Sequence, residues 1–140
     1  MAKPLEHAKS SARKFGGVPD DYLAIHDELD QTKSAHPDNR HRAILHSAYG
    51  IFLLEKIFGK TITNSVGREV HVRDIGEQHV IEDLNFIPTL SDYLDCMEMR
   101  PWMSGLAHED AALAPPGRLV VNKRKSAKAR NPSPQDDLAD

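Results

Sequence analysis

The stretch best suited to form the core of this chain also carries its densest polar chemistry. Residues 40–58 read RHRAILHSAYGIFLLEKIF, with two arginines, two histidines and a glycine among the apolar residues. Apolar side chains lie nearly all round a helix of this sequence, which favours cover on several sides. Burying a polar group without a partner costs free energy. We therefore expect a helical domain with a polar site built into its core.

Length and composition predict one domain followed by a tail. A chain of 140 residues with 39% hydrophobic content suits a single core. No aromatic residue follows Trp102, and the remaining sequence is rich in Pro, Ala, Ser and charge. Such a composition buries too little apolar surface to offset chain entropy. We predict a compact domain over residues 1–105 and a flexible Pro/Ala/Lys-rich tail over 106–140.

Charge, cysteine content and hydropathy exclude several classes of protein. The net charge of -3 gives no global field for nucleic acid or an anionic membrane. The single cysteine, Cys96, excludes an internal disulfide framework and a cysteine-based zinc site. The first residues lack the apolar core of a signal peptide, and no run reaches the roughly 18 apolar residues of a membrane span. We expect a cytoplasmic protein, in the host cytoplasm if the chain is phage-encoded.

Glycine, proline and changes of period indicate the order of the elements. A helix is predicted over about 19–34, starting at Pro19, and a central helix from Asp38 or Asn39 to Phe58, ending at Gly59. Alternation then predicts a small hairpin near 61–72, followed by a helix through about 73–84 and a last helix after Pro88. The fold class is mainly α: a compact four- to five-helix domain with one small β-hairpin and a flexible C-terminal tail. Gly50 is interpreted as a close helix crossing.

Histidines and carboxylates share faces of the predicted helices. Two His/Asp pairs have i,i+4 spacing, which can aim both side chains at one point. His41 falls within the central apolar stripe, whereas His46 lies about 140° round the same helix and is expected in a layer behind the ligands. Imidazole and carboxylate suit zinc, manganese or iron. The predicted metal ligands are His26, Asp30, His41, His79 and Asp83.

Three further residues give the site a chemical hypothesis. Glu77 falls on the same side of its helix as Val80, Ile81 and Leu84, where a carboxylate needs a partner, and it is the candidate general base or a further ligand. Arg40 and Arg42 lie in the first turn of the central helix, where they would hold a phosphate or carboxylate. A metal-bound water could act as a nucleophile. The first hypothesis is a small metal-binding protein, acting as a metal-dependent hydrolase of a phosphate-containing substrate.

Other hypotheses remain open on the same residues. The cluster could be a buried polar network that only fixes the fold of a non-enzymatic, phage-type accessory protein, which binds a host or virion component. The dipeptide of His26 and Asp27 matches that of metal-dependent phosphohydrolases, but it is too short to carry weight. The basic run KRKSAKAR could contact nucleic acid phosphates, so such binding is expected only through the tail. The ligand is therefore a small anion or a protein partner.

Taken together, several segments point to a family. The segments are IHDELD, RHRAILHSAYGIF, FGKTITNS, VRDIGEQHVIEDL, IPTLSDYL and PWMSG. They resemble a small family of uncharacterised proteins of bacteriophages and bacteria over about residues 5–105. The resemblance implies one compact domain and no activity. It implies that the family's polar positions include Arg73, which joins the candidate anion-binding residues.

Overall fold

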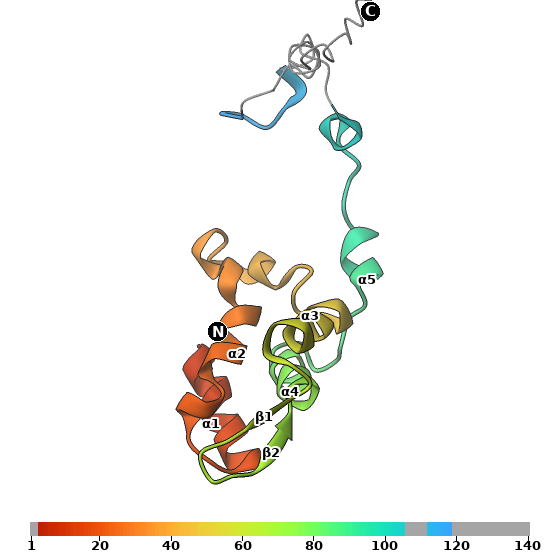
Figure 1. Ribbon diagram of the computed structural model, residues 1–140. Helices are drawn as coiled ribbons and strands as arrows, with labels where there is room; N and C mark the ends of the chain where they lie inside the picture. Colours follow the sequence, from red (N-terminus) through yellow and green to blue (C-terminus); the bar gives the residue numbers. More distant parts are fainter. Residues whose placement is uncertain (1–2, 106–111, 119–140) are drawn as a thin grey trace, which may run out of the picture. The chain divides into compact units, whose positions relative to one another are not determined.

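The computed structural model describes residues 3–105 and 112–118. The chain divides into two compact units, Met1–Met97 and Glu98–Asp140. The first holds five α-helices and a two-stranded antiparallel hairpin (Figure 1), so the mainly α prediction is confirmed. The described part of the second includes a 3₁₀ turn, η4 (Pro101–Ser104). Of the predicted tail, residues 106–111 and 119–140, with the run KRKSAKAR, lie outside the described residues.

An N-terminal helix, α1 (Pro4–Phe15), precedes the predicted elements. Proline at its first position suits a helix start, and Gly16 ends it with a φ of 85°. Its buried residues are His7, Ala8, Ser11 and Phe15, and this spacing places them in one stripe along the helix. This stripe brings a histidine and a serine into the interior together with the apolar residues.

The predicted helix over 19–34 is three shorter pieces. These are η1 (Pro19–Asp21), α2 (Leu23–Leu29) and η2 (Gln31–Ser34). Asp30 leaves the helical conformation, with φ -95° and ψ 6°, and its side chain is buried. Thr32 and Ser34 follow, and such residues weaken a helix because their hydroxyls bond the nearby backbone. Here Thr32 Oγ1 donates to the carbonyl of His41 at 2.6 Å.

The predicted central helix is also broken, which corrects its continuous span. A 3₁₀ turn, η3 (Asn39–Arg42), is followed by a reversal of the chain, and α3 runs only over Ala48–Phe58. Ile44 lies at the centre of the reversal with a φ of 71°, and the amide of Leu45 donates to the carbonyl of Ala43 at 2.9 Å. This three-residue turn is a strained type. Ser47 Oγ then accepts from the amide of Gly50 and caps α3.

Two glycines allow close approaches, and the structure corrects the prediction for Gly50. A Cβ on Gly50 would meet the carbonyl oxygen of Leu45 at 1.7 Å, so Gly50 accommodates the chain reversal rather than a helix crossing. The crossing is at Gly76 of α4, where a Cβ would lie 2.9 Å from Leu54 and 3.3 Å from Ile51 of α3. Both glycines therefore position the segments that carry the polar cluster.

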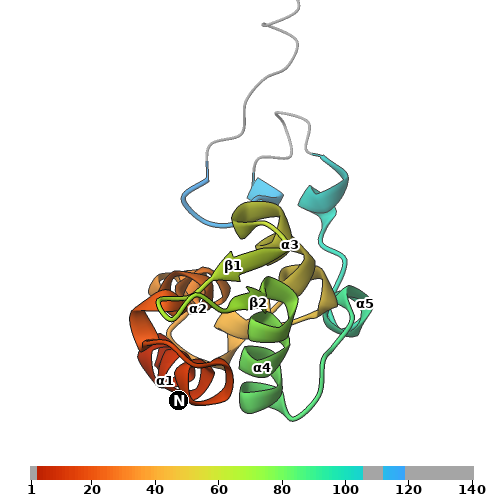
Figure 2. The same cartoon turned by 60° about the horizontal axis from the view of Figure 1, so that its bottom comes forward.

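The remaining elements of this unit follow the predicted order. β1 (Thr61–Thr63) pairs antiparallel with β2 (Glu69–His71), and α4 (Val72–Leu84) follows at once. α5 (Leu90–Leu94) starts after Pro88 with Thr89 as its cap. α4 contacts α1, α2 and α3, and Figure 2 shows it beside α1. No described helix has the length and apolarity needed to cross a bilayer.

Candidate metal centre

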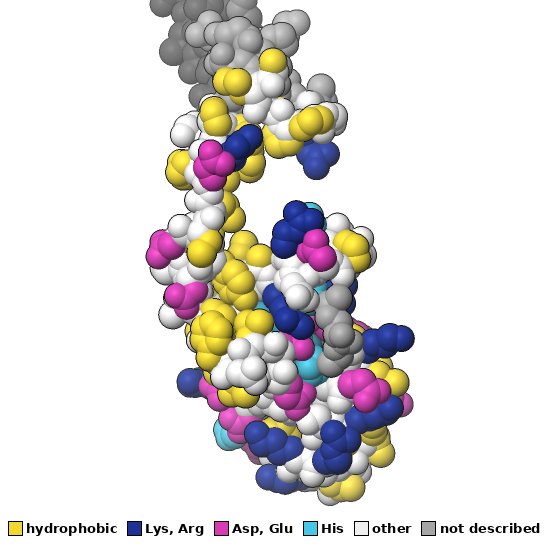
Figure 3. All heavy atoms as spheres, turned by 180° about the vertical axis from the view of Figure 1, so that it is seen from behind, with side chains coloured by type: hydrophobic (Ala, Val, Ile, Leu, Met, Phe, Trp, Pro, Cys, Tyr) yellow, Lys and Arg dark blue, Asp and Glu magenta, His cyan; other side chains and the backbone are white. Residues whose placement is uncertain are grey.

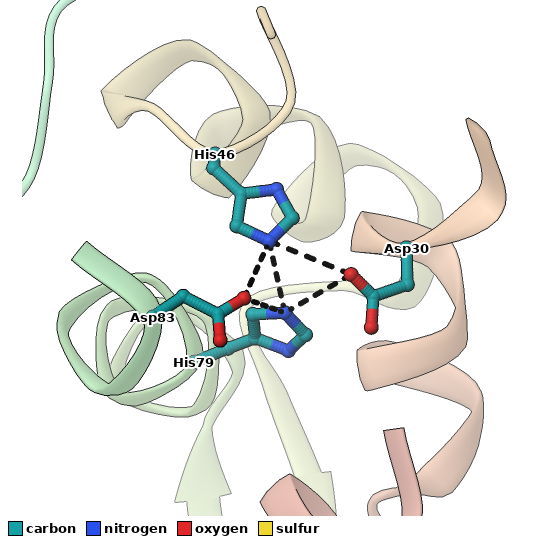
Figure 4. Close-up of side chains that lie close together, drawn as sticks. All are labelled: Asp30, His46, His79 and Asp83. Carbon is teal, nitrogen blue, oxygen red and sulfur yellow. Dashed lines mark hydrogen bonds and ion pairs between the residues drawn. The ribbon is translucent and has the colours of Figure 1, made fainter. Parts of the chain in front are cut away.

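Four side chains from three parts of the first unit point at one another. They are Asp30 at the end of α2, His46 in the turn before α3, and His79 and Asp83 on α4 (Figure 4). Each offers one ligand atom, and these four atoms all lie within 4.8 Å of one another. His79 and Asp83 are a predicted i,i+4 pair, and the helix does aim both at one point.

The separations match those of ligands around one ion. His46 Nε2 lies 3.0 Å from Asp83 Oδ2, 3.1 Å from His79 Nε2 and 3.5 Å from Asp30 Oδ1. His79 Nε2 lies 3.5 Å from Asp30 Oδ1 and 3.6 Å from Asp83 Oδ2. Atoms bonded at about 2.0–2.1 Å to a tetrahedral zinc ion lie about 3.3–3.4 Å apart. Small shifts of the side chains would therefore place all four in contact with one metal ion.

The centre is closed to solvent. The side chains of His46 and His79 are 0% exposed, and those of Asp30 and Asp83 are 2% and 4% exposed. Buried carboxylates need compensating charge or several hydrogen bonds. Lys33 Nζ lies 2.8 Å from Asp30 Oδ2, and Arg42 Nη2 lies 3.4 Å from Asp83 Oδ1. Each carboxylate thus has one cationic side chain on the oxygen that faces away from the four-atom set.

Hydrogen bonds behind His79 determine which of its nitrogens carries a proton. Gln78 Nε2 donates to the carbonyl of His7 and to Glu82, so its Oε1 accepts from Ser11 Oγ at 2.8 Å. Ser11 Oγ has one proton to give, and it must accept from His26 Nε2 at 2.8 Å. A neutral His26 then accepts on Nδ1 from His79 Nδ1 at 2.9 Å. A neutral His79 consequently presents Nε2 to the centre as an acceptor.

His41 presents an acceptor in the same way. Its Nδ1 donates to the carbonyl of Asp38 at 2.7 Å, which leaves Nε2 unprotonated in the neutral ring. Nε2 lies 3.4 Å from Asp30 Oδ1. Among the described residues both atoms are buried and have no hydrogen-bond partner. In the neutral form of His41 two acceptors thus face each other, and a cation between them would satisfy both.

The pKa values agree with this distribution of charge. Burial opposes the ionisation of Asp30, but contacts with His79 and Lys33 lower its pKa to about 2. Burial opposes that of Asp83 too, yet contacts with His46, His7 and His79 hold its pKa well below the usual value. Burial lowers the pKa of His26 to about 2 and also lowers the pKa of His46. At neutral pH the two carboxylates are therefore charged, whereas His26 and His46 are neutral.

The structure places His26 and His46 differently from the predicted layers. Both ring nitrogens of His26 bond to protein atoms, so His26 lies behind His79 rather than among the ligand atoms. His46 is one of the four because the chain reverses between His41 and His46, whereas a continuous helix would separate them. Asp27 is exposed, so the His-Asp dipeptide does not supply two ligands to one ion.

His7 is a member of the site that no sequence prediction included. Its Nδ1 lies 2.6 Å from Glu82 Oε2, and its Nε2 lies 3.4 Å from Asp83 Oδ1. Burial alone would lower the pKa of His7, but the bonds to Asp83 and Glu82 raise it. The ring stacks on His79 with centroids 3.9 Å apart. The available signal was the apolar stripe of α1, which includes His7 and Ser11.

The remaining predicted residues lie around the centre or away from it. Arg42 is 15% exposed and contacts Asp83. Arg40 pairs with Asp38 in an exposed position, and Arg73 pairs with Glu77 at 2.7 Å on the surface of α4. On the face in Figure 3, Lys and Arg side chains are interspersed with Asp and Glu. Anion binding by the arginines and a base role for Glu77 stay predictions.

Comparison with known proteins identifies a family whose function is unknown. No curated protein and no solved structure matches the chain. A family model described as a domain of unknown function, DUF6915, matches residues 2–103. The match spans α1 to α5 and includes all residues of the centre, and it agrees with the resemblance to an uncharacterised family. The chain therefore belongs to the DUF6915 family of domains of unknown function.

Proposed function

We propose that this domain binds one divalent transition-metal ion through Asp30, His46, His79 and Asp83. The observation that carries the proposal is the convergence of unprotonated acceptors on Asp30 Oδ1. His79 Nε2 and His41 Nε2 lie 3.5 and 3.4 Å from this oxygen, and in the neutral rings the hydrogen bonds on their other nitrogens leave no proton for the contact. A metal ion supplies the missing positive charge and takes a lone pair from each ligand.

The ligand types narrow the choice of ion. Two imidazole nitrogens and two carboxylate oxygens suit zinc, manganese or iron, whereas calcium and magnesium prefer oxygen alone. The four residues come from the end of α2, the turn before α3, and α4. An ion bound among them would link these segments, and its binding free energy would add to the stability of the fold.

The geometry supports metal binding better than hydrolysis. A hydrolytic metal keeps an open position for water, with a base close by. The four ligand side chains are at most 4% exposed, and Glu77 pairs with Arg73 on the surface. Hydrolysis of a phosphate-containing substrate would need a movement that uncovers the centre. We therefore propose that the ion has a structural role and holds the segments of the domain together.

Elemental analysis of untagged protein, purified without chelator, tests the proposal. We expect about one equivalent of zinc, manganese or iron, and a loss of the metal in His79→Ala and in Asp83→Asn, which keeps the side-chain shape. His71→Ala is the matched control, since His71 is exposed on β2. If the ions are added back to metal-free protein and none binds, the proposal fails. The cluster would then be a polar network that only fixes the fold.

A further inference from the structure

The segment that joins α2 to the turn before α3 has almost nothing buried. Between Gln31 and Ile44, all described, His41 is the one residue that is buried, and the others are exposed or half-buried. Elsewhere in the first unit, each helix from α1 to α4 buries apolar side chains in the core. Apolar burial therefore contributes little to holding residues 31–44 in place. His41 is the side chain of this segment that is buried in the domain.

His41 is held in the orientation that a ligand needs. Its Nδ1 donates to the carbonyl of Asp38, and its own carbonyl accepts from Thr32 Oγ1, so ring and backbone are both fixed. Its Nε2 is buried, has no hydrogen-bond partner among the described residues, and lies 3.4 Å from Asp30 Oδ1. A backbone carbonyl is one of the usual partners of the far nitrogen of a metal-bound histidine.

We infer that His41 Nε2 is a fifth ligand of the ion held by Asp30, His46, His79 and Asp83, and that this bond fastens residues 31–44 to the domain. The inference rests on the proposed function. Asp30 Oδ1 lies close to His41 as well as to His46 and His79. An ion bound to this oxygen would therefore be near all three histidines. Ligands on opposite sides of an ion with bonds of about 2.1 Å lie about 4.2 Å apart. His41 Nε2 is not among the four atoms that lie within 4.8 Å of one another, so a fifth bond needs the His41 ring to move towards the ion.

Two other contacts of this segment with the centre involve the same carboxylates. Lys33 pairs with Asp30, and Arg42 approaches Asp83. Both carboxylates are ligands, so their orientation changes with the state of the ion. Five ligands of mixed nitrogen and oxygen suit manganese, iron or an expanded zinc site more than a closed four-coordinate zinc site. The inference thus assigns a five-coordinate divalent transition-metal ion to this site.

X-ray absorption spectroscopy of the Zn²⁺-loaded full chain counts the imidazoles bound to the metal. We expect three in the wild type, two in His41→Ala, and three in the control His36→Ala, which removes an exposed histidine of the same segment. Two imidazoles in the wild-type protein would overturn the inference without any variant, and so would a second equivalent of bound zinc. A wild-type protein that binds no zinc would instead defeat the proposed function itself.

Amide hydrogen exchange tests the fastening separately. Zn²⁺ should slow exchange in residues 31–44 and in α4 of the wild type and of His36→Ala. In His41→Ala it should still slow exchange in α4, which shows a folded, metal-loaded domain, but no longer in residues 31–44. Equal protection of residues 31–44 in His41→Ala and the wild type would overturn the role of His41.

Discussion

The Nε2 atoms of His46 and His79 lie 3.1 Å apart, and both face the carboxylates of Asp30 and Asp83. Since His79 Nδ1 donates to His26, a neutral His79 has no proton on Nε2. Without a metal, the hydrogen bond between the two Nε2 atoms, or from His46 to Asp83, needs a proton on His46 Nε2. With a metal, both nitrogens offer lone pairs to it. The same side chains can therefore form a hydrogen-bonded core or a coordination sphere, and the predictions below separate the two.

Metal ions should stabilise chelator-treated protein against unfolding. An ion that binds only the folded state, present at 100 times its dissociation constant, adds about 2.7 kcal/mol to the free energy of unfolding. We expect Zn²⁺ or Mn²⁺ to raise the melting temperature of the wild type but not of Asp83→Asn. Asp74→Asn, which changes an exposed carboxylate of the same helix, should respond like the wild type. An unchanged wild-type melting curve would contradict a metal centre.

Ser11→Ala should weaken metal binding although Ser11 touches no ligand atom of the four. Ser11 Oγ accepts from His26 Nε2, and this bond sets the protonation of His79. Loss of such an outer partner lowers metal affinity by about 10- to 100-fold. Competition with a chromophoric chelator measures the change. Ser10→Ala, which removes an exposed bond between α1 and Glu82 of α4, is the control. Equal affinities of the two variants would show that the hydrogen-bonded chain does not orient His79.

The parts of the site that follow from local spacing could be predicted from the sequence. His79 and Asp83 form an i,i+4 pair on one face of a helix, and α4 keeps that helix over both residues. The hairpin near 61–72 follows from alternation and turn residues, and it is confirmed as β1 and β2. These elements depend on interactions between residues that are close in the sequence, so a local sequence pattern can predict them.

The role of His46 could not be predicted because it depends on the chain reversal before α3. A β-branched residue such as Ile44 rarely adopts a positive φ, so nothing local indicates a turn there. The helical periodicity of residues 40–58 favours one continuous helix, which would turn His46 away from His41. His7 was missed for another reason, since its partner Glu82 is 75 residues away. The apolar stripe of α1 indicates that His7 is buried, but no local pattern indicates which residue it contacts.

The metal-free protein should lose stability as the pH falls from about 6.5 to 4.5. Burial lowers the pKa of His26 to about 2 and also lowers that of His46, so the unfolded state binds more protons in this window. Stability from a lowered pKa is present above the unfolded value and declines below it. One such group contributes up to about 1.4 kcal/mol per pH unit. The raised pKa of His7 acts mainly above pH 6.5, where its contribution falls as pH rises.

Urea unfolding at several pH values, in the presence of chelator, measures this dependence. The slope of stability against pH should be smaller in His26→Gln, which removes one buried titrating group. It should be unchanged in His36→Ala, because His36 is exposed. A wild-type stability that stays level or increases between pH 6.5 and 4.5 would contradict the buried neutral imidazoles.

Gly50→Ala should disturb both the fold and the metal centre. The new Cβ would lie 1.7 Å from the carbonyl oxygen of Leu45, a backbone atom that can move only if the chain reversal moves with it. Overpacking of this kind costs about 1–3 kcal/mol. The shift would displace His46, which directly follows Leu45, so metal affinity should fall together with the free energy of unfolding. Tyr49→Ala, at the exposed neighbouring position, should change neither by a comparable amount. Denaturant unfolding and elemental analysis of the two variants provide the test, and a Gly50→Ala protein with wild-type stability and full metal content would show that the reversal does not fix His46.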